Sequence, residues 1–470
     1  MKILLIEPPP TSDKGNLRTL GSMGTFKADM AWPPLDLMII SGLLDKDGYE
    51  TSILDANTLR LNFSQVKDCI NNEKPELVVF TTSTPTIYHD LKIADITKEV
   101  SPDTKTAAVG THIMALPAET LKENKNLDFS ILSESEMVIL ELLNANLNPE
   151  DIKGVAYRRG DEIVKNPPHP LWYDLDVFGF PSHHKVPINH YRDPLMKRSP
   201  MTITYTERGC INACIYCSSP FYSKVRQRSI PRVIEELKWI VSLGIREIRF
   251  FDCGLTNYIN RTNSLLDEMI KEKIDLTWAC NVRADRFPLD IAKKMKEAGC
   301  HTVNIGAESA DLEVLKNIRK NITPDMVEKA VLTAKKAGLK ALVYFMLGLP
   351  GETNETIKKT VSFAKKIGPE LITLGIATPH PGTKFYEYLD NKGYLVTKNW
   401  SEYDPIKSPV YNYPGLSSAE IELARDKGYR SFYLRPAYIL KRFFSQRKIF
   451  DVINNFKNFI GFMKRYVLKT

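Results

Sequence analysis

The stretch TYTERGCINACIYCSSP, residues 204–220, holds three of the seven cysteines in this chain of 470 residues. Cys210, Cys214 and Cys217 follow one another in C-x3-C-x2-C spacing, directly after an apolar run that we interpret as a strand. Three thiolates can each ligate one iron of a four-iron cluster, which leaves the fourth iron without a protein ligand. A structural zinc site is the alternative, but it needs four ligands, and the loop holds no further Cys or His. The spacing therefore favours an iron–sulfur centre with one open coordination site.

After this loop, short apolar runs alternate with segments of helical pattern, such as residues 231–244 (PRVIEELKWIVSLG). Strands separated by helices indicate parallel pairing with right-handed crossovers, and Gly244, Gly299 and Gly338 stand where helices should end. Six such units predict a partial (β/α)6 TIM barrel over residues 201–394, with functional groups at the carboxyl ends of its strands. The expected strands are 202–207, 246–252, 276–281, 301–308, 340–348 and 370–377.

Residues 1–150 show the same alternation and predict an α/β domain with a doubly wound, Rossmann-like sheet. Ligands of such sheets bind beyond the carboxyl ends of the strands. The first strand is followed by EPPPTSDKGN and not by G-x-G-x-x-G, so a dinucleotide is disfavoured as the ligand. The expected strands are 2–7, 50–56, 76–82, 105–110 and 128–133.

Two regions complete the predicted organisation. Residues 151–200 read as a small hairpin, at 154–165, followed by a proline-rich linker. Residues 395–470 read as a helical, basic C-terminal region. Residues 430–470 hold ten Lys or Arg and one acid, which more than accounts for the net charge of +8. Because the rest of the chain is close to neutral, we expect no nucleic-acid partner.

The overall composition, with 43% hydrophobic and 26% charged residues, is typical of a soluble globular protein. The start, MKILLIEPPP, lacks the apolar core of a signal peptide, and no apolar run reaches membrane-spanning length. The scattered, odd number of cysteines does not suit a disulfide framework. We therefore expect a cytoplasmic protein, and we expect it to be a monomer.

The cysteine spacing, with Tyr216 before the third cysteine, resembles the signature of the radical S-adenosylmethionine (SAM) superfamily over about residues 200–390. The resemblance implies a [4Fe–4S] cluster on Cys210, Cys214 and Cys217, whose open iron chelates the amino and carboxylate groups of SAM. One-electron reduction, by a donor such as flavodoxin or ferredoxin, then cleaves a C–S bond and yields a 5′-deoxyadenosyl radical. An enzyme of this kind is oxygen-sensitive.

The same resemblance implies SAM contacts at successive strand ends. The acid in RFFDCGLTN would contact the methionine amino group, and the arginine in NVRADRF would hold a carboxylate in a bidentate fork. The acid and serine in NIGAES would bind the ribose, and the glycines of MLGLPGET would allow close approach of the backbone to adenine. Taken singly, these charged residues are more often structural ion pairs. The implied SAM-binding set is Tyr216, Asp252, Arg283, Glu308, Ser309 and Leu349.

Three other cysteines, Cys253, Cys280 and Cys300, lie in the predicted barrel. Many relatives have a second acid where this chain has Cys253, so the match is imperfect there. Free cysteine is among the most buried residue types. We therefore expect all three to be core thiols, and not ligands of a second cluster.

The N-terminal half resembles the cobalamin-binding subfamily of radical SAM enzymes, through segments such as TTSTPT, AVGTHIMALPAETL and ILSESE. The D-x-H-x-x-G motif that supplies an axial histidine to cobalt in some cobalamin enzymes is absent, so His112 is expected to be a wall or amide contact. The alternative is a Rossmann-like domain that has lost its ligand. The implied cobalamin contacts are Pro9, Ser83, Thr84, Gly110, Thr111, His112, Leu116, Ser133 and Glu134.

The tail segment FYLRPAYILKRF resembles the subgroup that contains anaerobic Mg-protoporphyrin ester cyclases and hopanoid ring-contracting enzymes. The tail predicts either a helix packed on the barrel or contact with a membrane surface through an apolar face with a basic rim. The combined resemblances imply methylation of an unactivated carbon in a small molecule, such as a lipid or isoprenoid. Cyclisation or rearrangement without net methyl transfer is the alternative. A non-catalytic cluster-carrying or cobalamin-sensing module is disfavoured, because the strand-end residues are intact.

Overall fold

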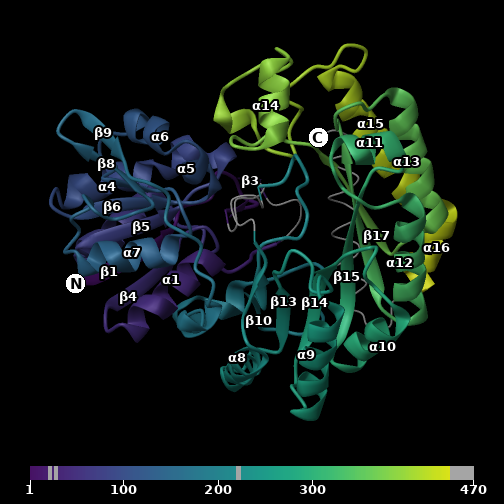
Figure 1. Ribbon diagram of the computed structural model, residues 1–470, viewed down its shortest axis with the longest axis horizontal. Coiled ribbons are helices and arrows are strands. Elements are labelled where there is room, and N and C mark those ends of the chain that lie inside the picture. The colour runs from purple at the N-terminus through teal and green to yellow at the C-terminus, as the bar shows by residue number, and fades with distance from the viewer. Residues whose placement is uncertain (19–23, 26–29, 219–223, 445–470) are drawn as a thin grey trace.

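The computed structural model describes residues 1–18, 24–25, 30–218 and 224–444. Figure 1 shows two α/β units side by side, the N-terminal unit in purple and blue and the barrel in teal and green. Helices of the C-terminal region lie against the barrel. The predicted combination of a doubly wound sheet and a partial barrel is confirmed. The basic tail from residue 445 onward, and the predictions made for it, lie outside the described residues.

The N-terminal sheet has seven strands, of which the first five in the row are parallel. The predicted hairpin is present, and it extends this same sheet, because β8 pairs antiparallel with β7. In spatial order the strands are β4 (Glu50–Asp55), β1 (Lys2–Glu7), β5 (Leu77–Thr81), β6 (Lys105–Val109), β7 (Phe129–Ile131), β8 (Val155–Arg159) and β9 (Glu162–Lys165).

Both faces of this sheet are covered by helices. Successive side chains of a strand point to opposite faces, and in β1 Ile3 and Leu5 enter one core while Leu4 and Ile6 enter the other. This is why the strand reads as a continuous apolar run. One core is closed by α1 (Leu35–Lys46) and α7 (Ser135–Asn144), and the other by α2 (Phe63–Glu73), α4 (Lys92–Val100) and α6 (Pro117–Glu123). Short elements complete the unit: β2 (Asn16–Leu17), β3 (Gly24–Thr25), η2 (Thr84–Thr86), α3 (Ile87–Asp90) and α5 (Thr111–Ala115).

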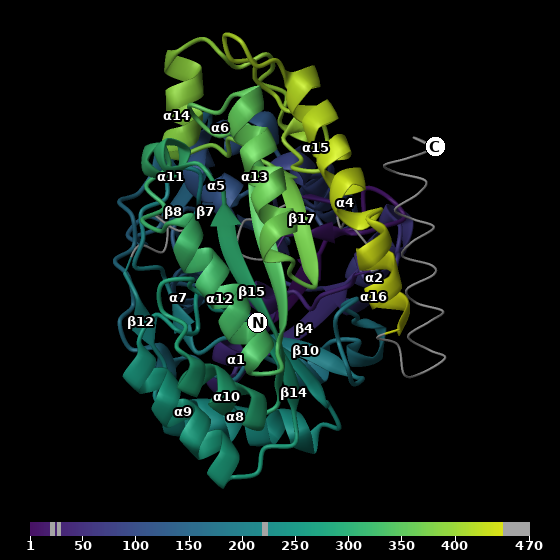
Figure 2. The ribbon, with the colours of Figure 1, turned by 90° about the vertical axis from the view of Figure 1, so that its right-hand side faces the viewer.

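The barrel is a six-stranded parallel sheet whose strands follow one another in chain order. Its helices pack on the outer face, as Figure 2 shows for α12 and α13 beside β15 and β17. The strands are β10 (Met201–Thr204), β13 (Glu247–Phe250), β14 (Thr277–Val282), β15 (Cys300–Glu308), β16 (Lys340–Leu347) and β17 (Leu371–Ile376). The helices are α8 (Ile230–Ser242), α9 (Ile259–Lys271), α10 (Leu289–Glu297), α11 (Leu312–Asn317), α12 (Pro324–Lys336) and α13 (Asn354–Ile367).

The C-terminal region covers the edge strand β17. Helix α15 (Ser418–Tyr433) packs on β17 and α13, and two of its tyrosine hydroxyls bond to the strand. Tyr429 accepts from the backbone N–H of Leu374, and Tyr433 donates to the carbonyl of Ile372 at 2.8 Å. Exposed backbone groups on an edge strand invite pairing with another chain, so these hydroxyls protect the edge. The remaining elements are α14 (Lys384–Asn391), η7 (Trp400–Glu402) and α16 (Pro436–Phe444).

Short segments between the two sheets join the units: η3 (Leu175–Val177), η4 (His183–Lys185), η5 (Ile188–His190), β11 (Glu207–Arg208) and β12 (Arg226–Gln227). Glu134, which follows β7, forms a buried ion pair with Arg226 and lies 3.7 Å from Arg208. Because Arg208 follows β10, loops at the carboxyl ends of both sheets meet here. Within the described residues, no helix is both long and apolar enough to cross a membrane.

Candidate active site

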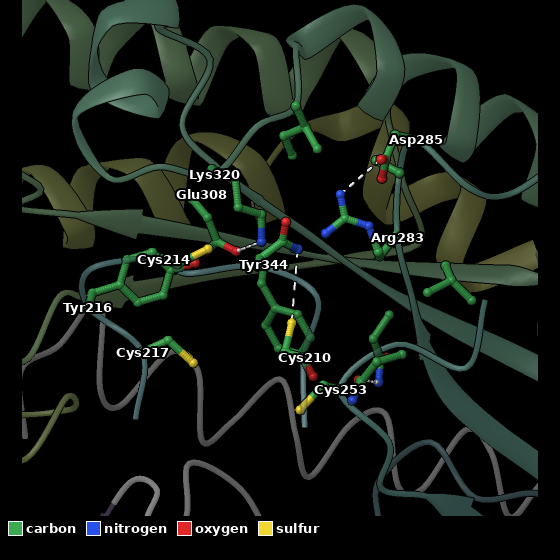
Figure 3. A pocket seen from close by; sticks show the side chains of 17 residues that line it. Cys210, Cys214, Tyr216, Cys217, Cys253, Arg283, Asp285, Glu308, Lys320 and Tyr344 are labelled. Carbon is green, nitrogen blue, oxygen red and sulfur yellow. Dashed lines mark hydrogen bonds and ion pairs between the residues drawn. The ribbon is translucent and has the colours of Figure 1, made fainter. Parts of the chain in front are cut away.

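A cavity of about 300 Å³ lies at the carboxyl ends of the barrel strands. Cys210, Cys214 and Cys217, which their spacing assigns to one centre, all line this cavity. Figure 3 shows their sulfur atoms around the same space as Glu308 and Arg283. The cysteine loop is fixed against the barrel, since the N–H of Ile215 donates to the carbonyl of Ile318 at 3.2 Å.

The three thiols have different surroundings. The side chain of Asn212 donates to the sulfur of Cys210 at 3.9 Å, and Cys214 donates to the carbonyl of Arg319 at 3.7 Å. A hydrogen bond from the Cys253 thiol lowers the pKa of Cys210 to about 6, against the opposing effect of burial. Burial raises the pKa of Cys214 to about 11. Soft thiolate donors suit iron–sulfur clusters and zinc, and they do not suit Mg²⁺ or Ca²⁺.

An ion pair between Glu308 and Lys320 forms one wall of the cavity, with Oε1 and Nζ 2.7 Å apart. Glu308 ends β15 with a φ of +61°, at a point where the pairing with β16 is irregular. A non-glycine residue in this conformation is strained, and such strain is concentrated at functional sites. Gly306 makes room for the pair, because a Cβ there would lie 2.6 Å from Glu308 Oε1. Lys320 was not predicted from the sequence, since it lies outside any motif.

Two polar groups in the cavity wall have buried atoms without a hydrogen-bond partner among the described residues. One is Nε of Arg283 and the other is Oδ1 of Asn304. Arg283 is held by Asp285, which accepts from its Nη2 at 2.8 Å. Asn304 is held by Asn281, which accepts from its Nδ2 at 3.1 Å. Buried polar atoms are rarely left unsatisfied, so this wall is suited to a polar ligand.

Of the predicted SAM contacts, Tyr216, Arg283 and Glu308 line the cavity, and the other three side chains do not. Asp252 is turned toward the backbone and accepts from the N–H groups of Thr206 at 2.7 Å and Glu207 at 2.8 Å. The hydroxyl of Ser309 lies 3.3 Å from that of Thr360 and accepts from the N–H of Asp311. Leu349 is fully buried. Sequence spacing places a residue at a strand end but does not fix which way its side chain points.

The expectation of three core thiols is correct for Cys280 and Cys300, which are buried. It is wrong for Cys253, which is exposed and lines the cavity. Cys253 follows β13 in a loop, whereas the other two lie within strands. A loop at the carboxyl end of a barrel strand faces the site and not the core.

The predicted cobalamin contacts gather beyond β1, β5, β6 and β7 of the N-terminal sheet. Pro9 follows β1, and its carbonyl accepts from Arg18 and lies 3.0 Å from Nε2 of His89. Gly110 follows β6 with a φ of +130°, and a Cβ there would lie 2.4 Å from the carbonyl oxygen of Thr82. Only glycine therefore lets the β5 and β6 loops approach so closely. Ser83 and Thr84 follow β5, with Thr84 beginning η2, and Thr111 and Leu116 lie at the start and just past the end of α5, which follows β6.

The last two predicted contacts, Ser133 and Glu134, follow β7. The hydroxyl of Ser133 accepts from the N–H of His169 at 2.9 Å. Glu134 is occupied by its ion pair with Arg226, which also lowers its pKa against the effect of burial. Both side chains therefore already have protein partners, and Glu134 connects the two units of the chain.

His112 is buried beside residues from distant parts of the chain. Its Nδ1 lies 3.3 Å from Oγ1 of Thr84, and its ring packs edge-on against Trp400 with centroids 5.4 Å apart. Burial, and then the nearby His380, lower the pKa of His112 to about 3. Burial lowers the pKa of His380 to about 4, and its Nδ1 has no hydrogen-bond partner among the described residues. Both imidazoles are therefore neutral at pH 7. Neither Trp400 nor His380 carries a sequence signal of this contact.

Comparisons with known proteins identify the family of the chain. The model of the radical SAM superfamily matches residues 205–364, and that of the B12 binding domain matches residues 21–143. An uncharacterized methyltransferase of Pyrococcus horikoshii is 34% identical over 450 residues, which cover 94% of this chain and 95% of that protein. The anaerobic magnesium-protoporphyrin IX monomethyl ester cyclase of Rubrivivax gelatinosus is 27% identical over 429 residues, covering 87% of this chain and 75% of that protein.

Among solved structures, the radical SAM methyltransferase TsrM of Kitasatospora setae, with cobalamin and a [4Fe–4S] cluster bound, has the same fold. Its TM-score is 0.67 at 17% sequence identity, and the match covers 83% of this chain and 78% of that one. The two family models account for both units of the chain, and the Pyrococcus relative spans nearly its whole length. The chain belongs to the radical SAM enzymes that carry a B12-binding domain, whose cofactors are a [4Fe–4S] cluster, SAM and cobalamin.

Proposed function

We propose that Cys210, Cys214 and Cys217 hold the [4Fe–4S] cluster in this cavity, and that SAM binds beside it. The observation that carries the proposal is that three cysteines share one cavity with a guanidinium and a carboxylate. The bound cofactors supply a 5′-deoxyadenosyl radical and a cobalt centre. The cysteine set fits the cluster, because each thiolate serves one iron and one iron stays free for SAM.

The protein's own part is to bind and orient SAM. Arg283 is held by Asp285, and its Nε, which no described residue satisfies, suits a carboxylate. Glu308 is aimed by its left-handed backbone and by Lys320, and its carboxylate is suited to accept hydrogen bonds from ribose hydroxyls. Oδ1 of Asn304, which has no hydrogen-bond partner in the described part of the chain, is suited to accept from an amino group. Asp252 and Ser309 do not line the cavity, but their hydrogen bonds fix the loops that follow β13 and β15.

For cobalamin, we propose contacts with the loops after β1, β5 and β6. These loops offer hydroxyls and backbone groups. His380 adds a buried nitrogen that no residue of the described ranges satisfies, and this nitrogen suits the amide groups of a corrin. His112 stays neutral and bonds to Thr84, so we assign it to the wall of the site and not to cobalt.

The reaction we propose is methylation of an unactivated carbon in a small molecule such as a lipid or isoprenoid. The Pyrococcus relative, a methyltransferase by name, supports methylation. The resemblance to the cyclase of Rubrivivax supports the second candidate, oxidation or rearrangement without net methyl transfer. A one-electron donor such as flavodoxin or ferredoxin would supply the electron, and the enzyme would act as a cytoplasmic monomer.

The experiment that separates the two reactions uses SAM labelled in its methyl group, a strong reductant and an extract of lipids and small metabolites from the source cells. Methylation requires 5′-deoxyadenosine, S-adenosylhomocysteine and label in the product. Turnover with 5′-deoxyadenosine, but with neither S-adenosylhomocysteine nor label in the product, would leave the second candidate. The variant Arg283→Ala, with its cluster intact, is expected to form neither 5′-deoxyadenosine nor S-adenosylhomocysteine.

We also propose peripheral contact with anionic membranes through the basic C-terminus. Ile439 and Leu440 of α16 are 44% and 56% exposed, and the basic residues of 441–470 follow them directly. An apolar edge beside basic residues suits an anionic lipid surface. Sedimentation with anionic and with neutral vesicles tests this, because binding should require the anionic lipid and should weaken with salt. Failure to sediment with either kind of vesicle would favour simple packing on the barrel.

A further inference from the structure

We propose that Cys253 is a fourth thiolate ligand of the cluster in the SAM-free enzyme, and that SAM displaces it on binding. The inference rests on the proposed cluster site and adds a residue to it. On formation of the iron–sulfur bond the thiol gives its proton to solvent, and on displacement the thiolate takes a proton back. No electron is exchanged in either direction.

The position of Cys253 is the first argument. It is exposed, and it faces the same cavity as Cys210, Cys214 and Cys217. Its thiol is hydrogen-bonded to the sulfur of Cys210, and it lies within electrostatic range of Cys217. Figure 3 shows Cys210 and Cys253 as neighbours at one end of the cavity. Among the described residues that line the cavity, four are therefore cysteines, one more than the cluster signature uses.

The second argument is that the loop carrying Cys253 is held on both sides. The carboxylate of Asp252 accepts two backbone N–H groups, from Thr206 and Glu207. The carbonyl of Asp252 accepts from Nδ2 of Asn281 at 2.8 Å, and the N–H of Leu255 donates to the carbonyl of Asn281 at 2.9 Å. The backbone is thus fixed, and a change of position at Cys253 needs only rotation of its own side chain.

The third argument is a contrast with the other cysteine pair of the barrel. Cys280 and Cys300 also interact through their side chains, but both are buried and neither lines the cavity. Packing explains that pair completely. Packing does not explain an exposed thiol in a polar cavity, whose wall also holds Nε of Arg283 and Oδ1 of Asn304, two atoms that lack hydrogen-bond partners within the described residues. Iron in such clusters is held by cysteine thiolate, so a fourth thiolate beside an open iron is a competent ligand.

The test compares wild type, Cys253→Ala and Cys69→Ala after anaerobic reconstitution. Cys69 is a half-buried thiol of the N-terminal unit and controls for the loss of one thiol elsewhere. Two measurements are made without SAM: the EPR spectrum of the reduced cluster, and the amount of three-iron cluster formed on brief ferricyanide oxidation. SAM is then titrated into each protein. A Cys253→Ser variant keeps the shape of the side chain in case the alanine variant does not fold.

Without SAM, the spectrum of Cys253→Ala should differ from those of wild type and Cys69→Ala, and its three-iron fraction should be several-fold larger. With saturating SAM the three spectra should coincide. SAM should bind Cys253→Ala several-fold more tightly, since no thiolate has to be displaced. Cys253→Ser should differ from wild type in the same direction.

Identical spectra and equal three-iron fractions in the absence of SAM would overturn the proposal while leaving the three-cysteine site intact. Failure of wild type to bind about four irons per chain would instead count against the proposed function itself. The two failures are therefore distinguishable from one set of samples.

Discussion

The hydroxyl of Tyr411 donates to the carbonyl of Gly348 at 2.8 Å and lies 2.9 Å from that of Ala377. Tyr411 comes from the C-terminal region, whereas Gly348 directly follows β16, in the MLGLPGET segment, and Ala377 directly follows β17. A second hydroxyl, from Tyr413, bonds to the same Gly348 carbonyl at 3.0 Å. The C-terminal region therefore holds the loop that the resemblance assigns to adenine.

Tyr411→Phe should weaken SAM binding several-fold with normal iron content, because the loop after β16 loses its tie to β17. The loss of a buried hydrogen bond should also cost about 1–2 kcal/mol of stability. Tyr438→Phe is the matched control, since its hydroxyl bonds to the carbonyl of Glu370 at the opposite end of β17. Equilibrium dialysis with SAM and urea unfolding measure the two effects. Equal losses of SAM affinity in both variants would argue against a local effect.

Simultaneous replacement of Cys210, Cys214 and Cys217 by Ala should abolish iron binding. Reconstituted wild type should bind about four irons per chain, since three thiolates hold one four-iron cluster. Iron and sulfide analysis with visible absorption checks this, and Cys280→Ala serves as a control from the barrel core. Retention of a full cluster, or stoichiometric zinc in the native protein, would contradict the assignment.

The buried carboxyl of Glu352 should make the stability of the fold depend on pH. Burial raises the pKa of this carboxyl from 4.5 to about 8, although the N–H groups of Gly348 and Leu349 donate to it. The folded state thus keeps a proton that the unfolded state loses above pH 4.5, so this contribution to stability is lost as the pH rises toward 8. The stability of Glu352→Gln should not fall in this way. Relative to wild type, this variant should therefore become more stable between pH 5.5 and about 8. Urea unfolding of the apoprotein at pH 5.5 and at about pH 8 measures the free energy of unfolding of each variant. Glu355→Gln, at an exposed position, is the control. A constant difference between wild type and Glu352→Gln at the two pH values would contradict the prediction.

His112→Ala should leave the visible spectrum of bound cobalamin nearly unchanged, because the neutral imidazole is directed at Thr84. The affinity for cobalamin should fall several-fold, since the wall beside Trp400 loses a ring. Absorption spectra and equilibrium binding report these effects separately. A clear shift toward the spectrum of histidine-free cobalamin would mean that His112 ligates cobalt in the wild type.

The order of strands and helices was predictable because central strands such as β1 and β5 are buried on both faces and read as apolar runs. The cysteine motif was predictable because its spacing is local. The ion pair of Glu308 with Lys320, and the packing of Trp400 on His112, join residues with no common motif. The direction of Asp252 depends on the backbone N–H groups of Thr206 and Glu207, which follow the neighbouring strand β10 and which no pattern within the loop of Asp252 reveals.

The contact between His112 and Trp400 has a consequence for assembly. The N-terminal sheet is complete at Lys165, long before Trp400 is synthesised. The wall over His112 therefore stays open on the ribosome until the whole barrel has emerged. Closure of this wall therefore follows synthesis of the barrel, and a chain that stops before η7 would lack the ring that completes the wall.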